Sequence, residues 1–115
     1  MTRKDLSPGY QMTQSLHACV AFTQLYPEII QEWTRLSNYI VVLSVKDESD
    51  LIKLSTKLSC ENINFSSFTE PDINNQVTAI CIEPCDRSRR ICSNFPLALK
   101  EFNSGINKHT EMEST

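Results

Sequence analysis

Two runs of β-branched and apolar residues constrain the fold of this 115-residue chain more than any other feature. The first, Tyr39 to Val45 (YIVVLSV), is almost continuously apolar, which is typical of a strand buried on both faces. We therefore expect it to be a central strand. The second run, Val77 to Ile82 (VTAICI), has a similarly strong β pattern. Helical patterns before and between the runs favour a layered α/β domain with some parallel pairing.

Local start signals mark the helices around these runs. Ser7 and Pro8 are suited to the cap and first position of a helix that continues to about Tyr26. Pro27 disfavours helical geometry at Tyr26 and can itself start a second helix. Acidic residues at positions 47, 48 and 50 favour the start of a third helix. A weaker strand is expected at residues 63–68, and a short helix at residues 86–92.

The N-terminal end offers little material for a first strand, because Met1 to Lys4 is shorter than a strand of normal length. We predict a small mixed sheet of about four strands packed between helices, in three α/β/α layers, with a short or truncated first strand. Residues 1–103 are expected to form one domain, and the polar residues 104–115 a disordered tail.

Composition limits the location and the chemistry of the protein. No apolar run reaches the roughly 18 to 20 residues that span a bilayer, and the first residues lack a signal-peptide pattern, so we expect a cytoplasmic protein without a membrane partner. The net charge of −3 argues against a surface that binds nucleic acid everywhere, but permits a local basic patch. An odd number of cysteines without an export signal indicates reduced thiols, and their spacing is not that of a zinc site: Cys19, Cys60, Cys81, Cys85 and Cys92.

Two motifs at opposite ends of the chain are similar to those of a known family. One is the strand-like segment from Thr78 to Pro84 (TAICIEP), and the other consists of the opening residues Arg3, Lys4, Asp5, Leu6, Gly9, Gln14, His17 and Ala18. With the expected order of elements over roughly residues 1 to 102, the chain resembles a divergent member of the archaeal and eukaryotic, or second, class of peptidyl-tRNA hydrolases. The resemblance implies hydrolysis of the ester that joins a peptide to tRNA, without a cofactor or metal.

The chain departs from this family at two places. Tyr10 stands where the family has a lysine after the glycine, and Ser66 aligns with the aspartate of a family loop. Asp72 lies a few residues further on. These differences leave open a second hypothesis, a non-catalytic module on the same fold that binds tRNA or protein, and a third, hydrolysis of another acyl ester.

His17, Gln14 and Asp72 are the predicted catalytic residues. The spacing of Tyr10, Gln14 and His17 places their side chains on one face of the first helix. A neutral imidazole can position or deprotonate a water that attacks an ester carbonyl, while an amide or hydroxyl donates to the oxyanion. Glu70 or Asp72 would supply a carboxylate that orients the histidine. The alternative for His17 is a half-buried residue bonded to a backbone carbonyl.

Basic side chains near both ends of the domain are the predicted contacts for tRNA phosphates, since guanidinium groups bind phosphate in a bidentate manner. A solvated helix face is the alternative for the arginine cluster. The sequence leaves the oligomeric state open, with a homodimer as one option. The full set of predicted tRNA or substrate contacts is Arg3, Lys4, Tyr10, Thr78, Arg87, Arg89 and Arg90.

Overall fold

A computed structural model describes residues 1–99 of the chain, so the predicted tail at residues 104–115 lies outside the described part. The helices are α1 (Pro8–Leu25), α2 (Pro27–Leu36), α3 (Glu48–Cys60) and α4 (Asp86–Cys92), with a short 3₁₀ helix η1 (Pro71–Ile73). The strands are β1 (Thr2–Arg3), β2 (Ser44–Val45), β3 (Phe65–Glu70) and β4 (Gln76–Ile82).

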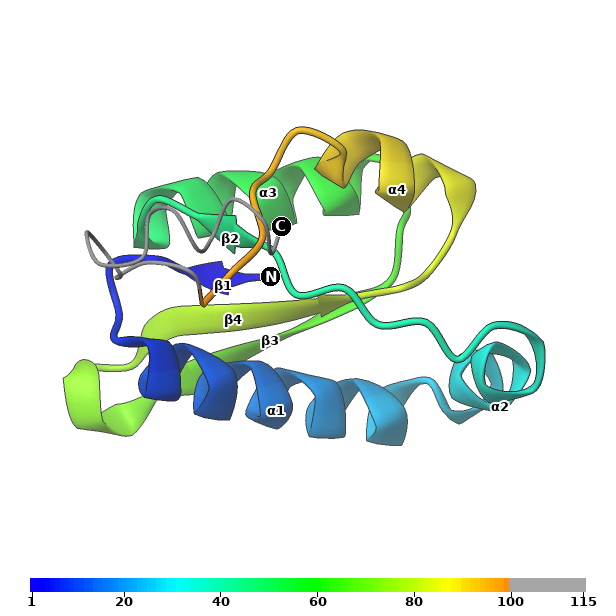
Figure 1. The fold of residues 1–115 in the computed structure, drawn as a ribbon, viewed down its shortest axis with the longest axis horizontal. Coiled ribbons are helices and arrows are strands. Elements are labelled where there is room, and N and C mark those ends of the chain that lie inside the picture. The colour runs from blue at the N-terminus through cyan, green and yellow to red at the C-terminus, as the bar shows by residue number, and fades with distance from the viewer. Residues whose placement is uncertain (100–115) are drawn as a thin grey trace, which may run out of the picture.

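The four strands form one mixed sheet in the order β2-β1-β4-β3. β1 pairs parallel to β2 and antiparallel to β4, and β3 and β4 form an antiparallel pair. Helix α1 covers one face of the sheet, and α3 and α4 lie over the other (Figure 1). The predicted three-layer α/β architecture with a small mixed sheet is therefore confirmed.

The prediction for Tyr39 to Val45 is wrong in both length and position. The strand is limited to Ser44 and Val45, and β2 lies at the edge of the sheet rather than at its centre. The first apolar side chains of the run are exposed, with 78% of Tyr39 and 70% of Ile40 accessible to solvent. The cause is the partner strand, because β1 has two residues and pairs with Ser44 and Val45 alone.

Local signals explain where the helices begin. The side chain of Asp47 accepts a hydrogen bond from the backbone N–H of Asp50 at 3.1 Å, which caps the start of α3 as the acidic cluster predicted. Pro8 and Pro27 occupy first positions of α1 and α2, where their missing N–H costs nothing. The predicted short helix at residues 86–92 is confirmed as α4.

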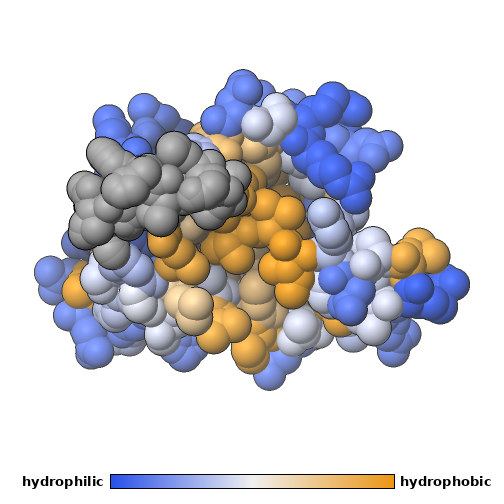
Figure 2. All heavy atoms as spheres, viewed as in Figure 1, coloured by the Kyte–Doolittle hydropathy of each residue, from blue (hydrophilic) through white to orange (hydrophobic). Residues whose placement is uncertain are grey.

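The two faces of the sheet are packed differently. Between the sheet and α3 lies an apolar core of Val45, Leu51, Leu54, Leu58, Ile63 and Ile80. The buried residues of α1 are instead Gln11, Gln14, Ala18 and Phe22, so half of them are polar. Apolar residues also gather in the middle of the face shown in Figure 2, and the exposed apolar side chains include Met12, Leu16, Val20, Ile40, Val41 and Leu97.

Candidate active site

A β-bulge in the hairpin of β3 and β4 gives the site its shape. Phe68 pairs with Ala79 and Thr69 with Val77, so Thr78 is an extra residue in β4. Such a bulge re-aims one side chain and leaves backbone groups without ladder partners. Here the hydroxyl of Thr78 reaches Gln14 on α1, with 2.6 Å between Thr78 Oγ1 and Gln14 Oε1.

Neighbouring side chains bind the backbone groups of the bulge. The N–H of Val77 donates to Glu48 Oε2 at 3.0 Å, and the carbonyl oxygen of Val77 accepts from Arg3 Nη1 at 3.1 Å. The hydroxyl of Thr2 donates to the carbonyl oxygen of Thr78 at 2.9 Å. Side chains of β1 and of the first turn of α3 therefore hold the bulge in place, so the bulge is a stable part of the fold.

A chain of hydrogen bonds leads from this bulge to the surface. Gln14 accepts from Thr78 through Oε1 and donates through Nε2 to Glu70 Oε1 at 3.0 Å. Thr78 and Gln14 are buried, with 0% and 1% of their areas exposed, whereas Glu70 is half-buried. The second carboxylate oxygen of Glu70 accepts from the backbone N–H of Asp72 at 3.1 Å. The Glu70 carboxylate is thus fixed from two sides and keeps access to solvent.

His17 lies on the same face of α1 as Gln14 and is exposed. Its imidazole stacks on the ring of Phe68 with 4.3 Å between centroids and 9° between planes. This stack fixes the plane of the imidazole, and no residue within the described range forms a hydrogen bond with its nitrogens. The alternative of a half-buried histidine bonded to a backbone carbonyl is therefore wrong, because Phe68 holds the ring by stacking instead.

Tyr10 lies one helical turn before Gln14 and is half-buried. Partial burial raises the pKa of the Tyr10 hydroxyl, and the negative charges of Glu70 and Asp72 raise it further. The phenol therefore keeps its proton at neutral pH. It presents a neutral hydrogen-bond donor at the end of the site where Glu70 lies.

The predicted catalytic carboxylate, Asp72, lies in η1 with an exposed side chain. The structure brings Glu70, rather than the Asp72 side chain, into contact with Gln14. The reason is the alternation of side chains along β3, because Ser66 and Phe68 contact α1 and Glu70 is the next residue on that face. Asp72 contributes its backbone N–H to the Glu70 carboxylate.

Arg3 is placed inside the fold rather than on a binding surface. It is 6% exposed, and its guanidinium donates to both carboxylate oxygens of Asp5 and to the side chain of Gln76. The hydrogen bonds to Asp5 raise the pKa of Arg3. Together with the hydrogen bond to the carbonyl oxygen of Val77, these contacts use the guanidinium N–H groups of Arg3 to hold the bulge.

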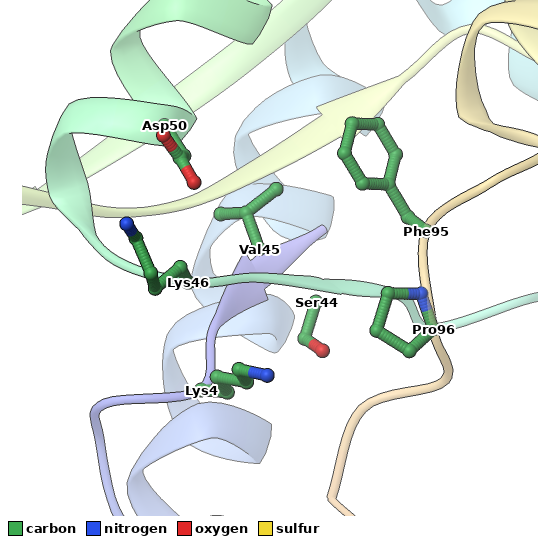
Figure 3. Close-up of a pocket in the computed structure, with 7 residues that line it drawn as sticks. All are labelled: Lys4, Ser44, Val45, Lys46, Asp50, Phe95 and Pro96. Atoms are coloured by element: carbon green, nitrogen blue, oxygen red, sulfur yellow. The ribbon is translucent and has the colours of Figure 1, made fainter.

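Lys4 is exposed and lines a shallow hollow beside β2 (Figure 3). The hollow is also lined by β2, by Lys46 directly after it, by Asp50 in the first turn of α3, and by Phe95 and Pro96. Figure 1 shows the end of β1 and the starts of α1 and α3 at the same end of the molecule, together with η1. The two lysines therefore lie at the end of the sheet where Tyr10 and Glu70 also lie.

The arginine cluster is not brought together with His17. Arg87, Arg89 and Arg90 are exposed on α4, which lies on the face of the sheet opposite to α1 (Figure 1). Arg87 forms an ion pair with Glu61 at 3.7 Å, and Arg89 one with Asp86 at 3.0 Å. Both pairs are exposed and reduce the local positive charge.

The contributors that sequence reasoning did not find include Thr2, Phe68 and Lys46. Phe68 was recognisable as one position of an alternating strand, but its partner His17 was not. Thr2 and Lys46 gave no local signal, because their positions depend on the pairing of β1 with β4 and β2. Among residues 1–99, no group of three or more His, Cys, Asp or Glu side chains is arranged to hold a metal ion. No helix in this part of the chain is both long enough and apolar enough to cross a membrane.

The fold and the site define a small three-layer α/β domain with a polar network beneath an exposed histidine. Comparison with family models found a match to the model described as Peptidyl-tRNA hydrolase PTH2, over residues 1–95. Because this match covers most of the 115 residues, the chain belongs to the PTH2 peptidyl-tRNA hydrolase family, as the opening and closing motifs predicted. A search of curated proteins found no match.

Proposed function

We propose that this protein hydrolyses the ester bond between the peptide and the tRNA of a peptidyl-tRNA. Membership of the PTH2 family supports this function. The observation that carries it is the hydrogen-bond chain from Thr2 through Thr78 and Gln14 to Glu70, next to the exposed His17. A network of this kind holds a carboxylate in a fixed place, which preorganises a site for a reacting water.

In the proposed mechanism, the attacking water lies between His17 and Glu70. Phe68, which stacks on His17, and Glu70 are two positions apart on β3, a separation of about 7 Å along a strand. A water placed between the imidazole and the carboxylate would donate one hydrogen to each group. His17 takes a proton as the water oxygen attacks the ester carbonyl, because histidine exchanges protons most readily near neutral pH. Gln14 is too deeply buried to reach the substrate, so it acts as a positioning residue for Glu70.

The developing oxyanion needs a hydrogen-bond donor, and we assign this role to Tyr10. Its raised pKa keeps the hydroxyl protonated, so the phenol can donate where a lysine would have supplied a positive charge. When the tetrahedral intermediate collapses, the bond from the carbonyl carbon to the ribose oxygen breaks. His17 then returns its proton to that oxygen, which releases the peptide as a carboxylic acid and free tRNA.

The phosphates of the acceptor end of tRNA would be contacted by Lys4 and Lys46, which flank the hollow at the same end of the sheet. The three arginines of α4 lie on the other face and would contact a more distant part of the tRNA backbone. We place the reaction in the cytoplasm, where translation supplies the substrate.

The test is turnover of a purified peptidyl-tRNA by the full chain and its His17→Ala variant. The variant should lose on the order of 10²-fold in turnover per folded molecule, with little change in stability. Gln24→Ala is the matched control, because Gln24 is also an exposed polar residue of α1. Full activity in His17→Ala would contradict this mechanism.

Two variants of Tyr10 separate hydrolysis from the non-catalytic alternative. If Tyr10 stabilises the oxyanion, Tyr10→Phe should reduce kcat by about 10² to 10³-fold while KM changes little. Turnover by Tyr10→Lys but not by the parent chain would indicate a binding module that has lost its cation. In that case, tRNA binding by the parent chain would remain measurable.

A further inference from the structure

The pairing of β3 and β4 directs Cys81 toward α1. Ser66 and Cys81 are paired residues of the two antiparallel strands, so their side chains point to the same face of the sheet. The hydroxyl of Ser66 donates to the backbone carbonyl oxygen of Ala18 on α1 at 2.8 Å. Cys81 therefore faces the turn of α1 that contains Ala18, and the next residue in that turn is Cys19.

The helix and the sheet approach closely at this point. Ala18 and Ala79 are fully buried, and a single serine hydroxyl bridges from β3 to the helix backbone. The register of β3 and β4 and the Ser66 bridge place the thiol of Cys81 in contact range of Cys19. This contact lowers the pKa of Cys19 to about 6, and the hydrogen bond to Cys19 raises the pKa of Cys81. Such a pairing produces a thiolate next to a thiol.

The two thiols differ in access to solvent. Cys19 is exposed, whereas Cys81 is half-buried beneath α1. A thiolate that is exposed and has a second thiol beside it has the arrangement of a redox-sensitive pair, in which one sulfur is oxidised first and the other resolves it. The exposed Cys60 on α3 belongs to the opposite helical layer and serves as a comparison.

We propose that Cys19 and Cys81 are a redox modification site, at which a hydroperoxide converts the two thiols into an intramolecular disulfide. The Cys19 thiolate attacks the peroxide, the O–O bond breaks, and Cys19 becomes a sulfenic acid while the peroxide is reduced to water or an alcohol. The sulfur of Cys81 then attacks the sulfenic sulfur and displaces its oxygen as water. A dithiol reverses the reaction by reducing the disulfide to two thiols.

This inference does not depend on the proposed hydrolysis, because it concerns a different pair of side chains. It has a structural consequence for the same helix, however. A bond between Cys19 and Cys81 would tie α1 to β4 two residues after His17. The disulfide requires Cα atoms within about 7 Å, a condition that the close approach of Ser66, the partner of Cys81, to Ala18 favours.

The experiment uses the full chain, reduced and then freed of reductant. Hydrogen peroxide is added in equimolar amount, and the protein is alkylated, digested without reduction and mapped by mass spectrometry. We expect a peptide pair linked through Cys19 and Cys81, loss of two thiols per chain, and recovery of both after treatment with dithiothreitol. A different pair, a link between two chains, or preferential oxidation of Cys60 would overturn the proposal.

Single variants separate the roles of the two sulfurs. Cys81→Ser should stop at the sulfenic acid of Cys19, which a dimedone probe labels, whereas Cys19→Ser should leave Cys81 reduced under the same treatment. The matched control Cys60→Ser should form the same disulfide as the parent chain. The mapping of the parent chain tests the proposal by itself. The proposal can therefore still be refuted if a variant fails to fold.

Discussion

Thr78→Val is the sharpest test of the buried network, because valine has nearly the same shape as threonine and leaves no cavity. The hydroxyl of Thr78 is the donor to Gln14 Oε1, and 0% of Thr78 and 1% of Gln14 are exposed. Water therefore cannot replace the lost donor without local opening. Leaving a buried acceptor unpaired costs about 1 to 3 kcal/mol, so we expect the free energy of unfolding to fall by that amount.

Urea unfolding followed by circular dichroism measures this change. With an m-value of about 1 to 3 kcal/mol per M, the transition midpoint should fall by roughly 1 M while m stays the same. Thr69→Val, an exposed position on the neighbouring strand, is the matched control and should change stability by less than about 0.5 kcal/mol. A Thr78→Val protein as stable as this control would refute the argument that the network is sealed from water.

Three further predictions concern other parts of the molecule. Asp47→Ala should cost about 0.5 to 2 kcal/mol of stability in the same urea assay, since it removes the cap of α3. Replacement of all three α4 arginines by alanine should reduce the salt dependence of tRNA binding, measured by titration at several salt concentrations, and an unchanged slope would exclude this cluster from the interface. Because the pKa of Cys19 is lowered to about 6, its alkylation should persist as pH falls from 8 and decline through pH 6, as followed by mass spectrometry. Cys81→Ala should move this decline toward the ordinary thiol range near pH 8.5, and an unmoved profile would show that the Cys81 contact is not its cause.

The parts of the fold that were predicted correctly depend on signals within a few residues. Prolines at 8 and 27 and the acidic cap at Asp47 act on the backbone beside them, so the sequence is sufficient to locate those helix starts. The run from Tyr39 to Val45 was misread because the burial of a strand depends on its neighbours. Its β-branched residues suit a strand, but β1 pairs with Ser44 and Val45 alone, so the residues before them have no partner in β1.

The same difference between local and long-range signals applies to the candidate site. Helical spacing is local, and it correctly grouped Gln14 with His17 on the face of α1 that meets β3. Identifying Glu70 rather than Asp72 as the partner of Gln14 required knowing which face of β3 meets α1, and that depends on how the hairpin packs against the helix. The sequence also carries no local signal for the bulge at Thr78 or for the approach of Cys81 to Cys19. Both depend on the pairing of β3 with β4.

The contrast between the two faces of the sheet explains why the site and the thiol pair share one helix. The α3 face is closed by apolar side chains, which supply the favourable free energy of burial without directional requirements. Helix α1 instead buries two glutamines, and the sheet below it presents Ser66 and Thr78, so its position depends on hydrogen bonds with defined geometry. Such bonds hold side chains in place at little net gain in stability. Because the apolar core on the α3 face stabilises the fold, the α1 face can hold polar and reactive side chains. The side chains of α1 that point toward β3 and β4 are therefore the most sensitive to the loss of a single contact.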